Sequence, residues 1–118
     1  MNITVIGTGG WGTALAVLLH GNGHRVTVWG RLNEEVDPIL AARENKAFLP
    51  GVRIPGEITV TLDTQAALRE AELVVLAVPS HGMRPICKQV GELLPRSAAI
   101  VHVAKGIENE TGDRKSVV

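Results

Sequence analysis

The chain has 118 residues, which is the size of one ordinary domain. Its 12 Lys and Arg side chains balance 12 Asp and Glu side chains, and this zero net charge removes the long-range attraction to polyanions on which nucleic-acid binders rely. The single Cys87 excludes an internal disulfide and a cysteine-based metal cluster, and it fits a reducing compartment. Glycine is in local excess, because four of the 13 glycines lie between Gly7 and Gly12.

Apolar runs in the sequence are short. The longest, residues 14–19 and 73–78, have six residues each, whereas a membrane-spanning helix needs about 20. The N-terminal Met1-Asn2-Ile3 carries no basic stretch, and glycine follows at position 7, so a secretory signal is not indicated. We therefore expect a cytoplasmic protein with neither a membrane nor a nucleic-acid partner.

The first predicted unit is a strand, a glycine-rich turn and a helix. Residues 3–6 form a short β-branched run that Gly7 ends, which predicts a buried strand. A helix follows and ends at Gly21 and Gly23. The helical spacing of its large apolar residues predicts one face that carries Trp11, Leu15, Leu18 and Leu19.

The second predicted unit again joins a strand to a helix. Arg25–Trp29 has the β-branched and aromatic residues of a strand. Either Asn33 or Asp37 caps the next helix, and Asp37 is favoured because Pro38 then takes the first helical position, where a proline costs nothing. This helix is expected to run to about Asn45.

The rest of the chain continues the alternation of strands and helices. In order, we expect an irregular connection with two turns at 47–57, a third strand at 58–62, a small helix capped by Asp63 or Thr64 and ending at Leu68, a central strand at 73–78, a helix from Met83 to Leu94, and a last strand at 98–103.

Regular alternation of strands and helices predicts an α/β fold with one doubly wound parallel sheet. We expect about five strands in the order 3-2-1-4-5, with helices on both faces, and residues 1–118 as one domain. Strands one and four then lie side by side, and a crevice opens at their carboxyl ends. The loops at that crevice are residues 7–12, 30–31, 79–82 and 104–106.

The first of these loops matches the G-x-G-x-x-G fingerprint of Rossmann-type dinucleotide-binding domains, and it lies between a predicted strand and a predicted helix. Gly7 permits the tight turn, Gly9 lets the backbone approach a pyrophosphate, and Gly12 lets the helix pack closely on its strand. Free N–H groups and the positive end of the helix attract phosphate. The Trp11 ring either packs in the core or contacts a ligand, and its N–H is free to bind phosphate in both cases.

The other loops supply further candidate residues. Where a strictly NAD-dependent site has an acidic residue after the second strand, this sequence has Arg31, which suits a 2′-phosphate or the adenine face and indicates NADPH, or both cofactors. Pro79 and Ser80 follow the central strand, so they are expected to border the nicotinamide, and Ser80 also suits a helix cap. Lys105 follows the last strand and suits a phosphorylated or carbonyl substrate. No catalytic triad or metal-ligand cluster is discernible.

Several segments together resemble one family, the N-terminal domain of bacterial NAD(P)-dependent glycerol-3-phosphate dehydrogenase. The similarity covers essentially the whole chain, and its most specific parts extend the glycine fingerprint and follow the last strand. The segments are Gly7-x-Gly9-x-Trp11-Gly12-Thr13-Ala14-Leu15, Trp29-Gly30-Arg31, Glu44-Asn45 with Phe48-Leu49-Pro50, Ala77-Val78-Pro79-Ser80 and Ala104-Lys105-Gly106-Ile107-Glu108.

The resemblance implies reversible hydride transfer between NADPH or NADH and the C2 carbon of dihydroxyacetone phosphate or sn-glycerol 3-phosphate, a step that supplies phospholipid synthesis. It implies cofactor contacts by Gly10, Trp11, Arg31 and Lys105, and a substrate contact by Lys105. Family members often have Ser or Asn at the position of Gly10, so only a backbone contact is expected there.

The resemblance also implies a second, helical domain, which this chain lacks and which holds the general acid/base lysine and contributes to a homodimer. We therefore assign no catalytic residue to this chain, and expect it to bind a dinucleotide but not to turn over substrate by itself. The alternative is a non-catalytic module that senses NAD(P)H. The segment around Lys105 favours the enzyme, because a sensor needs no lysine at the hydride end.

Overall fold

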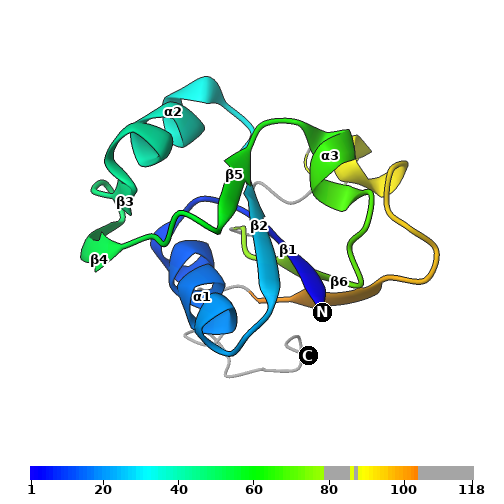
Figure 1. Ribbon diagram of the computed structural model, residues 1–118. Coiled ribbons are helices and arrows are strands. Elements are labelled where there is room, and N and C mark those ends of the chain that lie inside the picture. The colour runs from blue at the N-terminus through cyan, green and yellow to red at the C-terminus, as the bar shows by residue number, and fades with distance from the viewer. Residues whose placement is uncertain (79–85, 87, 104–118) are drawn as a thin grey trace, which may run out of the picture.

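The computed structural model describes residues 1–78, 86 and 88–103 (Figure 1). Residues 88–91 are helical, and no helix in these ranges is long and apolar enough to cross a membrane. The other helices and strands are β1 (Asn2–Ile6), α1 (Gly10–Gly21), β2 (Arg25–Trp29), α2 (Asn33–Ala42), β3 (Glu44–Asn45), β4 (Leu49–Arg53), β5 (Thr59–Thr61), α3 (Thr64–Leu68), β6 (Leu73–Leu76) and β7 (Ala99–His102).

Five of the strands form one parallel sheet in the order β5-β2-β1-β6-β7. Counted along the chain among these five, the order is 3-2-1-4-5, so the predicted topology is confirmed. Val5 in the central strand lies between Val28 of β2 and Val75 of β6. Strands β1 and β6 are therefore neighbours, and the chain leaves their carboxyl ends in different directions, which opens a crevice there.

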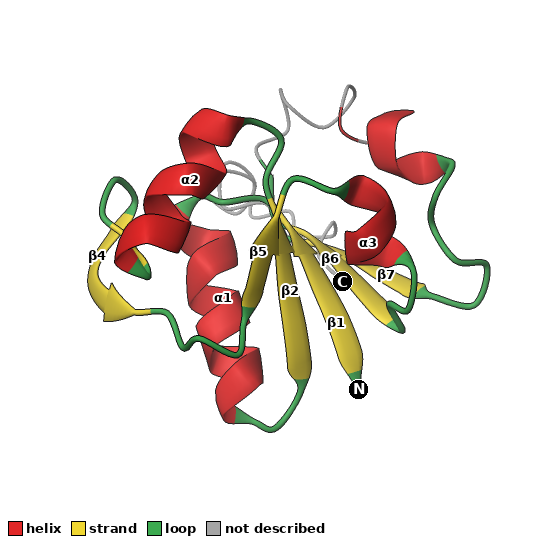
Figure 2. Ribbon diagram, turned by 45° about the horizontal axis from the view of Figure 1, so that its top comes forward, coloured by secondary structure: helices red, strands yellow, loops and turns green. Residues whose placement is uncertain are grey.

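Helices cover both faces of the sheet, as predicted (Figure 2). On one face, Ala16 of α1 and Val36 and Ile39 of α2 pack against the strands. On the other face, Leu68 of α3 and Val90 pack against them. Both sets of side chains are almost fully withdrawn from water, and this apolar burial is the main force that holds the layers together.

The buried face of α1 differs from the predicted one. Its buried residues are the small Gly12, Thr13 and Ala16, whereas Trp11 is 47% exposed and Leu18 is 59% exposed. Small side chains bring the helix axis close to the sheet, and a face of large apolar residues would hold it away. Helical spacing alone favoured the larger residues, so the predicted apolar face was wrong at Trp11 and Leu18.

Helix α2 begins earlier than predicted. Leu32, not Asp37, is its N-cap residue, and the backbone carbonyl of Leu32 accepts from the N–H of Val36 at 3.2 Å. Pro38 therefore lies inside the helix, where it removes a hydrogen bond. The burial of Val36 and Ile39 accounts for the early start of α2. Both side chains face the sheet only when the helix begins before Val36.

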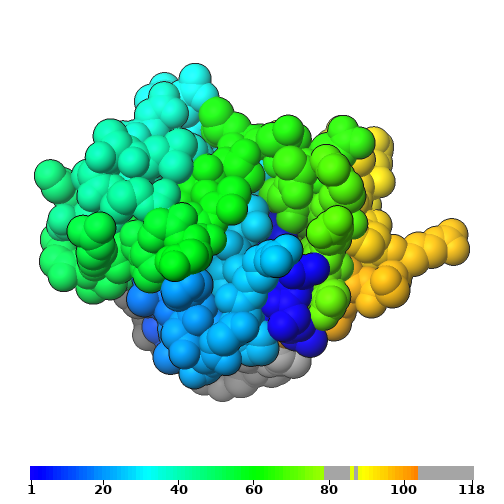
Figure 3. Space-filling model, viewed as in Figure 1, coloured from blue at the N-terminus to red at the C-terminus, as the bar shows by residue number. Residues whose placement is uncertain are grey.

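The chain between α2 and β5 holds a small antiparallel hairpin, where we predicted the end of a helix and an irregular connection. Strand β3 pairs with β4, and α2 ends at Ala42 because Arg43 adopts the left-handed conformation with φ of 51°. The hairpin and α2 lie side by side on the surface (Figure 3). A two-residue strand has no periodicity by which a sequence pattern identifies it.

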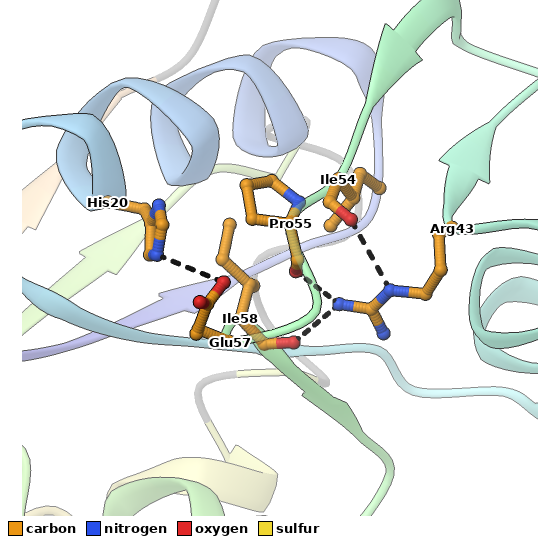
Figure 4. Close-up of polar contacts among 6 residues, drawn as sticks. All are labelled: His20, Arg43, Ile54, Pro55, Glu57 and Ile58. Atoms are coloured by element: carbon orange, nitrogen blue, oxygen red, sulfur yellow. Dashed lines mark hydrogen bonds and ion pairs between the residues drawn. The ribbon is translucent and has the colours of Figure 1, made fainter.

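The Arg43 guanidinium ties the hairpin to the segment that leads to β5. It donates to the carbonyls of Pro55 and Ile58 at 2.6 and 2.7 Å, and to that of Ile54 at 3.4 Å (Figure 4). A weaker contact lies nearby: His20 Nε2, in the last turn of α1, is 3.7 Å from a carboxylate oxygen of Glu57.

The remaining predicted elements are confirmed with shorter ends. Strands β5, β6 and β7 each lose residues at one or both ends relative to the predicted ranges. The Asp63 carboxylate caps α3 by accepting from the N–H of Ala66 at 3.1 Å. The predicted helix from Met83 is described only from residue 86, and it ends at residue 91 rather than at Leu94.

Candidate functional site

A crevice of about 420 Å³ lies at the carboxyl ends of the central strands, where the topology predicts it. A second cavity, of about 230 Å³, lies by the first residues of β1 and β2, away from the glycine-rich loop. The crevice is lined by parts of the glycine-rich loop, the end of β2, the start of α2, the hairpin and the residues after β6, namely Gly7, Thr8, Gly9, Trp29, Arg31, Leu32, Glu35, Phe48, Ala77, Val78 and Ile86.

Gly7 and Gly12 shape the loop as predicted. Gly7 has a φ of 129°, and a Cβ there would collide with the carbonyl oxygen of Ala77. A Cβ at Gly12 would lie 2.9 Å from the Gly7 oxygen and 3.2 Å from the Ala77 Cβ. The tight turn and the close helix packing therefore both require glycine, and these two structural roles are confirmed.

Gly9 and Gly10 leave the start of α1 accessible. Gly9 is the N-cap residue, no side chain caps the first turn, and that turn holds no acidic residue. Among the residues that the structure describes, none has an atom within 4 Å of a Cβ added to Gly9, so these residues leave open space in front of the loop. A helix N-terminus with free N–H groups facing open space is well suited to an anion.

Gly10 faces the hairpin rather than the open space. A Cβ there would lie 2.5 Å from the carbonyl oxygen of Phe48, so a larger residue would push the hairpin away. This close contact accounts for glycine at position 10. The Trp11 side chain is exposed and does not line the crevice, so the core-packing alternative for its ring is wrong.

Arg31 lies on the crevice as the sequence predicts, and the structure adds Glu35 beside it. The side chain of Arg31 is exposed, and its backbone N–H donates to Glu35 Oε1 at 3.1 Å. The Thr8 hydroxyl donates to the same oxygen at 3.3 Å. Sequence reasoning missed Glu35, although an acidic residue in the first turn of the helix after the second strand was a usable signal.

Asn45 is a second residue that sequence reasoning missed, and it fixes the glycine-rich loop. Its side chain is 4% exposed, and Nδ2 donates to the Thr8 carbonyl at 2.7 Å and to the Thr13 hydroxyl at 2.9 Å. The Oδ1 atom accepts from the N–H of Phe48 at 3.2 Å. One buried amide thus joins the loop, α1 and the hairpin, whose Phe48 forms a wall of the crevice.

Three predicted site residues, Pro79, Ser80 and Lys105, lie outside the described residues. Their predicted roles stay predictions. Within the ranges that the structure does describe, no group of three His, Cys, Asp or Glu side chains is arranged to hold a metal ion.

Known proteins share both the sequence and the fold of this chain. A family model described as NAD-dependent glycerol-3-phosphate dehydrogenase N-terminus matches residues 2–118. The chain is 47% identical over 117 residues to the glycerol-3-phosphate dehydrogenase (NAD(P)+) of Moorella thermoacetica, which covers 99% of this chain and 35% of that protein. The like-named protein of Listeria innocua is 41% identical over 116 residues, covering 98% of this chain and 34% of that protein.

A solved structure gives the same picture of the fold. The crystal structure of glycerol-3-phosphate dehydrogenase from Coxiella burnetii superposes with a TM-score of 0.82 at 24% identity, covering 95% of this chain and 38% of that chain. At this identity the likeness shows a shared fold. The chain spans about a third of the length of the curated relatives that it matches.

Proposed function

The chain belongs to the NAD-dependent glycerol-3-phosphate dehydrogenase N-terminal family, and on this premise we propose that it is the cofactor-binding part of such an enzyme. The whole enzyme transfers a hydride between NADPH or NADH and the C2 carbon of dihydroxyacetone phosphate or sn-glycerol 3-phosphate. The relatives match nearly all of this chain, and their name, glycerol-3-phosphate dehydrogenase (NAD(P)+), supports this reaction and both cofactors.

The observation that carries the proposal is the open N-terminus of α1 at the crevice. Its first turn has no acidic residue and, within the described part of the chain, no side-chain cap, and no atom of that part fills the space in front of Gly9. The pyrophosphate of a dinucleotide binds there to the N–H groups of Gly10 and Trp11, and the helix dipole favours its charge. The crevice then extends past Arg31 on one side and past Ala77 and Val78 on the other.

The remaining site residues complete the proposed complex. Arg31 contacts the adenosine end, either at a 2′-phosphate or over the adenine face. Pro79 and Ser80, which directly follow the lining residue Val78, border the nicotinamide. Lys105 contacts both the cofactor and the phosphorylated substrate. The general acid/base lysine and most substrate contacts belong to a second, helical domain of the longer enzyme, for which a cytoplasmic homodimer is part of the same proposal.

Calorimetric titration with NADPH and with NADH tests the proposal. The chain binds each dinucleotide saturably, and Gly9→Val weakens both by about tenfold or more, because its side chain takes the space of the ligand. Gly9 has a φ of −73°, so valine fits its backbone. The matched control is Gly56→Val, at an exposed glycine whose added Cβ likewise meets no atom of the described residues within 4 Å.

The control is expected to bind as the parent chain does. Circular dichroism establishes that each variant is folded before it is titrated. Absence of saturable binding by the folded parent chain would refute the proposal. Unchanged binding by Gly9→Val would place the dinucleotide somewhere other than the glycine-rich loop.

A further inference from the structure

Glu35 brings a carboxylate to the crevice at the point where β2 ends. It lies four residues after Arg31, in the first turn of α2, and lines the crevice together with Gly7 and Gly9. Two hydrogen bonds hold the carboxylate, from the Thr8 hydroxyl and from the backbone N–H of Arg31. The side chain is therefore oriented both by the glycine-rich loop, through Thr8, and by the backbone of Arg31 after β2.

The backbone around Glu35 leaves little freedom for another arrangement. A Cβ added to Gly30 would lie 2.6 Å from a Val36 methyl group, 2.8 Å from the Thr8 methyl group and 3.5 Å from Glu35 Oε1. Only glycine lets the β2–α2 loop pass this close to the glycine-rich loop. The position of the carboxylate is thus fixed by close packing as well as by hydrogen bonds.

One oxygen of this carboxylate is available to a ligand. Both hydrogen bonds go to Oε1, and among the residues that the structure describes Oε2 receives none. An ionised carboxylate accepts at about four sites on its two oxygens. Oε2 can therefore accept a hydrogen bond from a ligand that carries two neighbouring hydroxyl groups, since each hydroxyl donates one hydrogen bond. The adenosine ribose of a dinucleotide carries such a pair at the end of the second strand.

We propose that Glu35 determines cofactor specificity by accepting a hydrogen bond from the ribose hydroxyls of the adenosine end. The inference rests on the proposed function, and it names one residue that selects between NADH and NADPH at the proposed site. The carboxylate favours the free 2′-hydroxyl of NADH and repels the 2′-phosphate of NADPH, whereas the exposed guanidinium of Arg31 attracts that phosphate. The opposed charges of Arg31, before α2, and Glu35, in its first turn, thus leave the chain able to bind both cofactors.

The test compares Glu35→Gln with the parent chain in titrations with NADH and NADPH. Glutamine keeps an oxygen for Thr8 and for the N–H of Arg31, so the loop stays held while the charge is removed. Compared with the parent chain, Glu35→Gln is expected to bind NADPH more tightly and NADH more weakly. The ratio of the two dissociation constants is expected to shift about tenfold, which corresponds to the loss of one hydrogen bond to a charged group.

Glu34→Gln is the matched control, because it removes the same charge from the same helical turn. Glu34 is exposed and lines not the crevice but an adjoining cavity of about 280 Å³, so its charge is screened by solvent and the ratio changes by less than about twofold. AMP and adenosine 2′,5′-bisphosphate serve as further probes, since they carry only the adenosine end. The shift caused by Glu35→Gln persists with these two compounds.

Three results would overturn the inference while the proposed function stands. These are an unchanged ratio in Glu35→Gln, an equal shift in Glu34→Gln, and a shift that is lost with the adenosine fragments. If the folded parent chain binds neither NADH nor NADPH, the proposed function fails, and the inference fails with it.

Discussion

The buried amide of Asn45 gives the sharpest prediction about stability. Its three hydrogen bonds connect the Thr8 carbonyl, the Thr13 hydroxyl and the Phe48 N–H, and its side chain is 4% exposed. Replacement by alanine removes all three bonds and leaves the Thr8 carbonyl and the Phe48 N–H without these partners. Thr13 still donates to the Gly9 carbonyl at 2.8 Å, so the first turn of α1 keeps one tie to the loop.

The expected loss follows from the number of bonds. A buried hydrogen bond contributes about 1 kcal/mol net, so Asn45→Ala lowers the free energy of unfolding by about 3 kcal/mol. Asn45→Asp keeps an acceptor for Phe48 but turns a carboxylate toward the Thr8 carbonyl, and it is expected to be at least as destabilising. Domain stabilities of about 5–15 kcal/mol leave room to measure both variants as folded proteins.

Urea unfolding, followed by circular dichroism, measures the change. Asn33→Ala is the control, because Asn33 is exposed and this change is expected to alter the unfolding free energy by less than about 0.5 kcal/mol. Amide hydrogen exchange adds a local measurement, since the Phe48 N–H should exchange faster in Asn45→Ala. A loss below about 1 kcal/mol with unchanged exchange would refute the reasoning, because the three bonds would then contribute almost nothing.

Three further changes test the fold by the same unfolding measurement. Gly12→Ala is expected to lower the free energy of unfolding by about 1–3 kcal/mol, since the added methyl group would lie 2.9 Å from the Gly7 oxygen. An unchanged free energy of unfolding would contradict this close packing. Arg43→Met removes hydrogen bonds to three carbonyls and is expected to lower the free energy of unfolding by about 2–4 kcal/mol. An unchanged urea midpoint would show that water replaces these bonds. Glu57→Gln loses less than about 0.5 kcal/mol because the carboxylate is 78% exposed, and a larger loss would contradict the weak pairing with His20.

The sheet was predictable because its signals are local and repeated. Residues 3–6 and 25–29 are short β-branched or aromatic runs, each followed by glycine, and such runs form strands in most contexts. The alternation with helices then restricts the topology to very few arrangements. The glycine-rich loop was predictable for a related reason, since Gly7 and Gly12 meet steric demands that only glycine satisfies.

The parts that were missed depend on contacts between distant residues. The β3–β4 hairpin is held by Arg43, which reaches carbonyls up to 15 positions further along the chain. Asn45 bonds to Thr8 across 37 positions, and Glu35 bonds to Thr8 across 27. A single polar residue carries no periodic signal, so no local pattern marks such partners. Helix α2 shows the same effect, because tertiary burial of Val36 overrides the helix start favoured by Pro38.

The most direct test of dinucleotide binding at the glycine-rich loop is a nuclear magnetic resonance titration. Proton–nitrogen spectra of the labelled chain are recorded as NADPH is added. The largest shifts are expected for the backbone N–H groups of Gly9, Gly10 and Trp11, whereas the signals of residues 66–71, at the cavity by the first residues of β1 and β2, are expected to stay unchanged. Shifts confined to residues 66–71, or none in a folded chain, would contradict it.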